Sequence, residues 1–276
     1  MRNASLLRIT VALAFLLQPL IASADAKQQI ESHFHKKLFY IRGFYRDDQL
    51  VYDDHGNVQG QPQTGPWSLA LVQIDKVEVR SDEFRLQGRR GAAIYDAKQK
   101  KFEYITPGSA GKIKMIVRAP IGALSDSALD ALSERMFIAQ LTQQDLPEAW
   151  RDFFMGRPRI SKDFPPNVPV PNLQSDGQPV FRVSPKDGVN PPKPLATPDP
   201  SYEEVARQAK VQGTTVLNLI VNRQGLPEHI EVVKPLGMGL DDSAIETVSG
   251  WRFKPAMMSG QPVAVLISVE VAFRLY

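Results

Sequence analysis

The chain has 276 residues, and its 22 prolines and 18 glycines are too few and too irregularly spaced for a fibrous protein. Hydrophobic residues make up 43% of the sequence, which is enough for a packed core. The 33 lysines and arginines against 30 acidic residues leave a net charge of +3, which argues against a nucleic-acid partner. The absence of cysteine excludes disulfides, thiolate metal sites and cysteine nucleophiles.

Residues 1–26 have the pattern of a secretory signal peptide. Arg2 and Arg8 precede an apolar stretch at residues 9–17, and small residues at 22–26 fit an A-x-A cleavage site. The apolar stretch is shorter than the roughly 20 residues that span a bilayer comfortably. We therefore expect a cleaved leader and a periplasmic protein, with an inner-membrane anchor as the alternative if the leader is retained.

Residues 27–156 are predicted to form an antiparallel β-rich domain with two helices, of unknown function. Short apolar or alternating runs predict strands at residues 38–41, 49–52, 67–74, 76–80, 84–89, 92–95, 101–105 and 113–117. Ser125 is expected to cap the first helix, and Pro147 to lie early in a second, shorter helix that ends near Gly156.

This region offers few candidates for catalysis or metal binding. Asp53, Asp54 and His55 lie together in a predicted turn, where Asp is favoured for backbone reasons. His33 and His35 have no third ligand at a recognisable spacing. The sequence also has no nucleophile elbow, zinc-protease motif or phosphate-binding loop. We therefore predict that the protein is not an enzyme and uses no cofactor or metal.

Residues 157–195 are predicted to be a proline-rich linker. Eleven of the 22 prolines lie between Phe164 and Pro200, where strong apolar runs are scarce. Such a segment favours an extended, partly polyproline II conformation. A brief strand is expected inside it at residues 178–183.

Residues 196–276 are predicted to form an α+β domain in the order helix, β-hairpin, helix, long terminal strand. Ser201 and Glu204 have the spacing of a capping box at the start of the first helix. The hairpin strands are expected at residues 214–222 and 230–234, and Asp241 is expected to cap the second helix. The terminal segment alternates apolar and polar residues, as a half-buried strand does.

The order of these elements and their motifs resembles the TonB C-terminal domain. The matching motifs include Pro200-x-Tyr202, Leu240-Asp241, Trp251-Arg252-Phe253-x-Pro255 and Gly260-x-Pro262-Val263. The resemblance covers less than a third of the chain. The motif residues that we expect to be structural are Gly213, Gly225, Leu240, Trp251, Phe253 and Pro255.

The resemblance implies a function in transport across the outer membrane. In this family the domain receives a peptide segment of an outer-membrane transporter as an added strand beside its last strand, and backbone groups supply the affinity. The implied function is that of a periplasmic adaptor that supports transmembrane transport. The residues implied to form the binding edge are Ala264, Val265, Leu266, Ile267, Ser268, Val269, Glu270 and Val271, with Pro200, Ser201 and Tyr202 nearby.

Two alternatives stay open at the level of sequence. The same domain could serve an envelope scaffold that docks on another periplasmic protein or on a second copy of itself through the terminal strand. The strand edge could also be covered by the linker or by the first domain. Energy-transducing members of the family carry a membrane anchor with a helix histidine, whereas residues 1–26 contain no histidine. We therefore expect an adaptor rather than a full energy transducer.

Overall fold

The computed structural model describes residues 25–106, 111–156 and 168–275. The fold is of the mixed α+β class, as predicted. It divides into two compact units: unit 1 holds the described residues of Met1–Gly91 and Ala110–Gln140, and unit 2 those of Ala92–Ser109 and Leu141–Tyr276. Within the described ranges, no helix has both the length and the apolar character needed to cross a membrane. The predicted leader lies outside these ranges except for residues 25 and 26.

Unit 1 is built on a largely antiparallel sheet. Its strands follow the order β2 (Gln49–Tyr52), β6 (Lys112–Arg118), β4 (Glu83–Asp96), β3 (Leu71–Val79), β1 (Leu38–Ile41) and β7 (Phe137–Ile138). The β2–β6 pair is parallel. Phe84 and Leu86 are buried while Arg85 and Gln87 are half-buried, as their alternation predicted.

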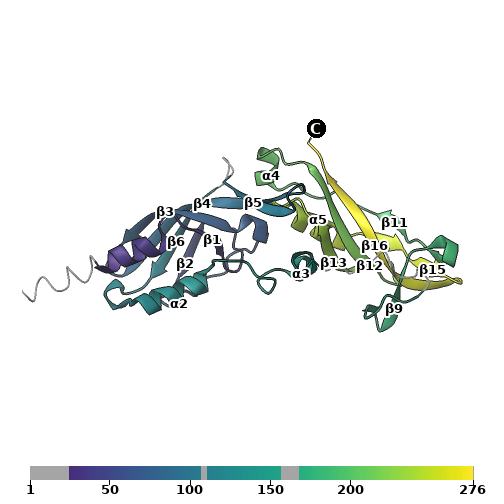
Figure 1. Cartoon of the computed structure of the whole chain (residues 1–276), viewed down its shortest axis with the longest axis horizontal. Helices are drawn as coiled ribbons and strands as arrows, with labels where there is room; N and C mark the ends of the chain where they lie inside the picture. Colours follow the sequence, from purple (N-terminus) through teal and green to yellow (C-terminus); the bar gives the residue numbers. More distant parts are fainter. Residues whose placement is uncertain (1–24, 107–110, 157–167, 276) are drawn as a thin grey trace, which may run out of the picture. The chain divides into compact units, whose positions relative to one another are not determined.

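Two helices pack on the buried face of this sheet, one at residues 25–34 and the other α2 (Asp126–Met136) (Figure 1). Their apolar residues, including Phe34 and Leu132, share one core with Phe84 and Met115 of the sheet. The Ser125 side chain accepts a hydrogen bond from the Ala128 N–H, which confirms it as the helix cap. A short 3-10 turn, η2 (Ile121–Ala123), precedes this helix.

One strand predicted in this unit is wrong at its start. Residues 67–69 form a 3-10 turn, η1 (Trp67–Leu69), and the strand β3 begins only at Leu71. Trp67 is 1% exposed. An apolar run of this length does not distinguish a buried turn from a buried strand.

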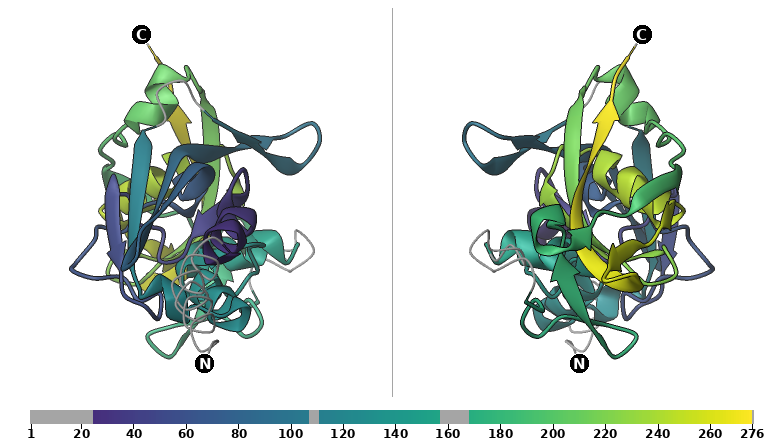
Figure 2. Two further views of the ribbon diagram at one scale, coloured as in Figure 1. Left: turned by 90° about the vertical axis from the view of Figure 1, so that its left-hand side faces the viewer. Right: turned by 90° about the vertical axis from the view of Figure 1, so that its right-hand side faces the viewer.

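The main sheet of unit 2 contains β12 (Gly213–Val221) and β16 (Gln261–Phe273), which run side by side (Figures 1 and 2). The strand order is β10 (Val189–Asn190), β15 (Ala256–Met258), β16, β12 and β13 (Pro227–Lys234), and β9 (Gln178–Arg182) pairs with β16 and with β8 (Gln174–Ser175). A separate pair joins β11 (Lys193–Ala196) to β14 (Arg252–Lys254).

The described residues of unit 2 include the α-helices α3 (Glu148–Phe154), α4 (Glu204–Gln208) and α5 (Leu240–Ser249). The second half of β4 forms a hairpin with β5 (Lys101–Ile105), and the Tyr95 N–H donates to the Leu236 carbonyl ahead of α5. Aromatic rings of this hairpin and of α3 form one cluster, in which the ring centroids of Phe102 and Trp150 are 6.0 Å apart. The helix predicted after Pro147 is thus present, and it packs within unit 2.

The structure differs from the predicted proline-rich linker. Residues 157–167 lie outside the described ranges, but β8, β9, β10, β11 and η3 (Pro185–Asp187) occupy much of the region from 174 to 196. The reason is local: Val170 and Val180 are apolar residues between the prolines, and they bury against Ile220, Ala264 and Leu266. Residues 92–106 and 141–156, predicted to belong with the first domain, group with unit 2.

Candidate functional site

One edge of the terminal strand β16 is only partly free to pair with another strand. One side of it pairs with β12 from Val265 to Phe273. On the other side, β9 pairs in parallel with Ala264, Val265 and Leu266. The prediction that these three residues lie on a free edge is therefore wrong, and the alternative that the 157–195 segment covers the edge holds for them. The backbone of this part of β16 is already paired with β9, and buried side chains of both strands share a small core.

The remaining part of the edge, from Ile267 to Phe273, is open opposite β12, because no strand in the described ranges pairs with it there. Ile267 and Val269 are half-buried on one face, and Ser268 and Glu270 are exposed on the other. Val271, also predicted at this edge, is 3% exposed. A strand edge with unpaired backbone groups can accept a further strand.

Pro200 and Tyr202 lie next to the end of this open edge. The Tyr202 ring packs edge-on against Phe273, with 5.5 Å between the ring centroids, and its hydroxyl donates to the Val211 carbonyl. Burial raises the pKa of the Tyr202 hydroxyl. A cavity of about 470 Å³ opens here, and its lining residues are Asp199, Pro200, Tyr202, Ala272, Phe273 and Arg274.

Ser201 plays a different part from the one predicted. The helix α4 is capped at Glu203, with no side-chain hydrogen bond, so Ser201 and Glu204 do not form a capping box. The Ser201 carbonyl instead accepts a hydrogen bond of 2.6 Å from the Ser243 hydroxyl of α5. Ser201 therefore ties its segment to α5, while Pro200 and Tyr202 reach the cavity.

The predicted structural residues meet around the hairpin turn between β12 and β13. Gly225 has a φ of 80°, and its carbonyl accepts a hydrogen bond from the Phe253 N–H at 2.9 Å. A Cβ atom on Gly225 would lie 1.8 Å from the Phe253 carbonyl oxygen, so only glycine fits. The Trp251 indole N–H donates to the Pro198 carbonyl at 3.2 Å.

The other members of this set have separate places. A Cβ atom on Gly213 would lie 2.6 Å from a methyl carbon of Leu236. Leu240 is the buried first residue of α5. Pro255 lies between β14 and β15. Gly213 lies opposite Phe273 in the β12–β16 pair.

Two buried carboxylates, those of Asp241 and Asp242, lie at the start of α5, and only Asp241 was predicted to have a role there. Asp241 lies inside the helix, whose cap is Gly239, and its carboxylate accepts hydrogen bonds from the Thr215 hydroxyl and from the N–H groups of Leu236 and Gly237. Burial raises the pKa of Asp241 to about 6, against these hydrogen bonds. Burial, reinforced by Asp241, raises the pKa of Asp242 to about 7. Sequence reasoning missed Asp242, since an acid early in a helix is usually exposed.

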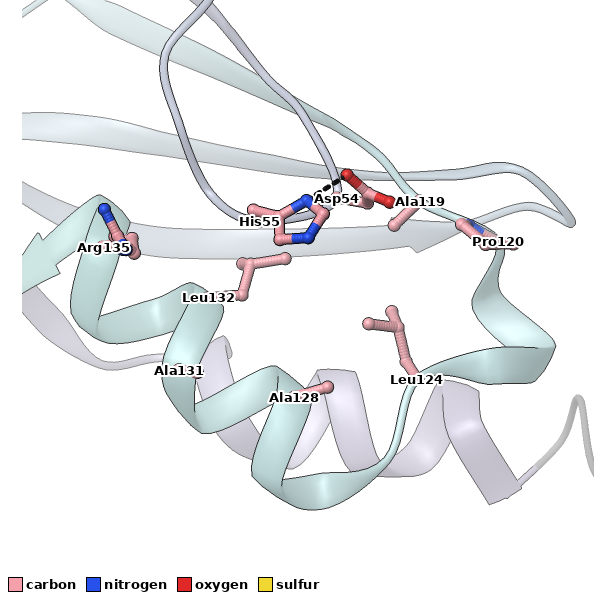
Figure 3. Close-up of a pocket in the computed structure, with 9 residues that line it drawn as sticks. All are labelled: Asp54, His55, Ala119, Pro120, Leu124, Ala128, Ala131, Leu132 and Arg135. Carbon is pink, nitrogen blue, oxygen red and sulfur yellow. Dashed lines mark hydrogen bonds and ion pairs between the residues drawn. The ribbon is translucent and has the colours of Figure 1, made fainter.

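A cavity in unit 1 lies between α2 and the turn after β2 (Figure 3). Its volume is about 340 Å³, and its lining residues are Asp54, His55, Ala119, Pro120, Leu124, Ala128, Ala131, Leu132 and Arg135. The Asp54 carboxylate lies 2.6 Å from His55 Nδ1. Ligand atoms of Asp53, Asp54 and His55 lie within 4.8 Å of one another.

The Asp53 carboxylate is committed to the turn itself. It accepts hydrogen bonds from the N–H groups of His55 and Asn57 at 3.0 and 2.8 Å. The side-chain hydrogen bond from Asn57 lowers the pKa of Asp53. This arrangement is that of an Asx turn, which accounts for the acidic residue at this position. His33 and His35 lie apart from it, with the His35 ring 3.0 Å from the Asp75 carbonyl.

Comparison with known proteins places the C-terminal region in a family. Residues 198–275 match the family model described as Gram-negative bacterial TonB protein C-terminal. The chain is 31% identical over 77 residues to Protein TonB of Vibrio cholerae, covering 28% of this chain and 32% of that protein. It is 33% identical over 82 residues to Protein tonB2 of Pseudomonas aeruginosa, covering 29% of this chain and 30% of that protein.

The chain thus spans about a third of the length of these curated relatives. Among solved structures, the solution NMR structure of the Pseudomonas aeruginosa TonB CTD aligns with 22% identity and a TM-score of 0.26, covering 30% of this chain and 86% of that one. The sequence matches agree with the motifs at Pro200-x-Tyr202 and Trp251-Arg252-Phe253-x-Pro255. Residues 198–275 of this chain are a TonB C-terminal domain.

Proposed function

We propose that the protein is a non-enzymatic periplasmic adaptor whose TonB C-terminal domain binds an extended segment of an outer-membrane transporter by strand addition, in support of transport. The observation that carries this proposal is the open edge of β16 from Ile267 to Phe273. Membership of residues 198–275 in the TonB C-terminal family supports it.

The physical basis is the hydrogen-bonding capacity of the edge. An added strand gains main-chain hydrogen bonds with β16, and its side chains cover neighbours on both faces of the sheet. Ile267 and Val269 are only half-buried in the free protein, so an added strand would remove more of their apolar surface from water. Pro200 and Tyr202 line a cavity at the end of the edge that can receive a side chain of the partner.

The test replaces Val269 with proline or with threonine. Proline removes a backbone N–H from β16 and fixes φ, whereas threonine keeps both the N–H and the β-branched shape. For a fluorescent peptide from the periplasm-facing segment of an outer-membrane transporter, we expect Val269→Pro to weaken binding at least tenfold and Val269→Thr to change it less than threefold. Anisotropy titration measures both, and circular dichroism checks that each variant is folded.

A folded Val269→Pro variant that binds the peptide as well as the wild type would contradict strand addition. Sedimentation of the wild type separates the alternative function. If two copies pair through β16, dimer formation should compete with the peptide and should be lost in Val269→Pro. Localisation is tested separately by N-terminal sequencing of protein recovered from the periplasmic fraction, for which we expect a start near residue 25.

A further inference from the structure

Strand β9 occupies one end of the edge that the proposed partner would use. It pairs Val180 with Ala264, Phe181 with Val265 and Arg182 with Leu266, all in parallel register. The open part of β16 begins at the next residue, Ile267. A partner strand entering this edge would therefore lie in line with β9.

Buried contacts hold β9 in place. Val180 is 0% exposed and packs in a small core with Val170, Ile220, Ala264 and Leu266. The Val170 N–H donates to the Val180 carbonyl at 2.8 Å, and Phe181 is 8% exposed. Displacing β9 would return both apolar side chains to water and break these backbone pairs, so a partner strand gains little by replacing it.

The chain leaves the edge directly after β9. Ser184 exchanges backbone hydrogen bonds with Val189, and η3 begins at Pro185. Pro185 has no N–H to donate to a neighbouring strand, and its φ is fixed near the value of the 3-10 turn that starts there. The segment then returns to pair β10 with β15. This turn explains why β9 ends at Arg182 and leaves the rest of β16 open.

We propose that β9 is a built-in stop, which limits an added strand to the seven residues from Ile267 to Phe273 and so fixes its register. The inference rests on the proposed function. A strand of this length spans about 23 Å. One of its ends abuts β9, and the other lies by the cavity lined by Pro200, Tyr202 and Phe273.

The two faces of the open edge specify the chemistry of the partner. Side chains of an added strand beside Ile267 and Val269 would be partly buried, which favours apolar residues at alternate positions. Those on the other face would lie beside Ser268 and Glu270, both exposed. The Glu270 carboxylate favours a lysine or arginine opposite it. The expected partner is thus a short extended segment with alternating apolar residues and a basic residue on the other face.

The first experiment is a length series. Synthetic fluorescent peptides alternate valine with threonine, carry one central lysine on the threonine face, and contain five, seven, nine or eleven residues. With the full chain, we expect affinity to rise from five to seven residues and then to change less than twofold up to eleven. A further gain of threefold or more with each added residue pair would overturn the stop.

A disulfide lock gives the second arm. The chain has no cysteine, so the double variant Arg182→Cys/Leu266→Cys can link β9 to β16 without competing thiols. A fixed stop predicts the same affinity plateau in the oxidised and reduced forms. If the eleven-residue peptide loses affinity only when the lock is oxidised, β9 is displaced by long partners and the stop is refuted.

A release variant gives the third arm. Val180→Asp places a carboxylate in the apolar core under β9 and should free Ala264 to Leu266, which lengthens the open edge to ten residues. We expect the affinity of this variant to keep rising from the seven-residue to the nine-residue peptide, where the wild type has already reached its plateau. If Val180→Asp does not fold, the length series and the disulfide-linked variant still test whether β9 limits the length of the added strand. Failure of every peptide to bind every form would refute the proposed function together with the stop, whereas a continued gain in the wild type would refute the stop alone.

Discussion

Gly225 and Gly260 have nearly the same positive φ, 80° and 79°, but different surroundings. A Cβ atom on Gly225 would meet the Phe253 carbonyl, whereas no atom lies within 4 Å of one on Gly260. We expect Gly260→Ala to lower the free energy of unfolding by about 1 kcal/mol through backbone strain alone. Gly225→Ala should cost about 3 kcal/mol or more, because β14 must also move. Urea titration of both variants measures this, and equal losses would contradict it.

Asp242 makes stability depend on pH. Burial raises its pKa from 3.8 to about 7, with Asp241 and Glu203 acting in the same direction and a hydrogen bond from Trp150 acting against them. The folded state therefore holds a proton that the unfolded state releases, and the free energy of unfolding falls as pH rises from about 4 through about 7. We expect Asp242→Asn to reduce this fall.

The measurement is the free energy of unfolding at pH 5 and pH 8 for both proteins. At pH 8 the variant should be the more stable, since asparagine carries no charge to bury. At pH 5 the two should differ less. Asp241 keeps its own raised pKa of about 6, so a weaker dependence should persist in the variant. A wild type that is more stable at pH 8 than at pH 5 would contradict the assignment.

At the scale of elements, Ser125 and Ser201 show how far a capping motif can be trusted. Both precede helices, but only the Ser125 side chain accepts a hydrogen bond from a helix N–H. We expect Ser125→Ala to lower the free energy of unfolding by about 1 kcal/mol and Ser125→Asp to preserve it. Thermal unfolding followed by circular dichroism measures the difference. An alanine variant as stable as the wild type would show that the cap contributes nothing.

Local pattern predicted most elements because their residues carry the period of their own structure. Phe84 and Leu86 alternate with polar residues in β4, and Leu129, Leu132 and Met136 recur at helical spacing in α2. Within residues 168–196, the strand expected at 178–183 is present as β9, but the other short strands were missed because the proline content favoured an extended chain. Val180 is buried only because Ile220 and Ala264, which are distant in sequence, supply the other half of its core.

The local features of the candidate site could be predicted from the sequence, but its non-local contacts could not. The position of the terminal strand follows from its alternation, whereas the proximity of Pro200 and Tyr202 to that strand was implied only by the family resemblance. The length of the open edge does not, because it depends on the non-local pairing of Ala264 with Val180. Sequence alone also gave no sign that Ser201 contacts Ser243.

For the whole molecule, the division into two units predicts two unfolding events. Trp150 is 0% exposed within unit 2, and Ser125 caps a helix of unit 1. In calorimetry we expect Trp150→Ala to lower one transition, at a cost of about 3–5 kcal/mol, and Ser125→Ala to lower the other. A single transition that shifts with both variants would contradict the division.

The matched family region is also smaller than the unit that contains it. The family model covers residues 198–275, whereas α3, the β4–β5 hairpin and β9 all pack within unit 2. Gly237 lies so close to Ala93 that a Cβ atom there would be 2.3 Å from the Ala93 carbonyl oxygen. The C-terminal domain of this chain is therefore completed by segments that precede it in sequence.

The pairing of β16 with both β12 and β9 has a consequence for the order of assembly. During synthesis, residues 168–182 leave the ribosome before residues 261–273, which form the strand on which they dock. Until residues 261–273 arrive, β12 has an exposed edge and Val180 has no core to enter. Nascent chains at this stage should depend on chaperones, and translation products that stop before residue 261 should be substrates for proteolysis.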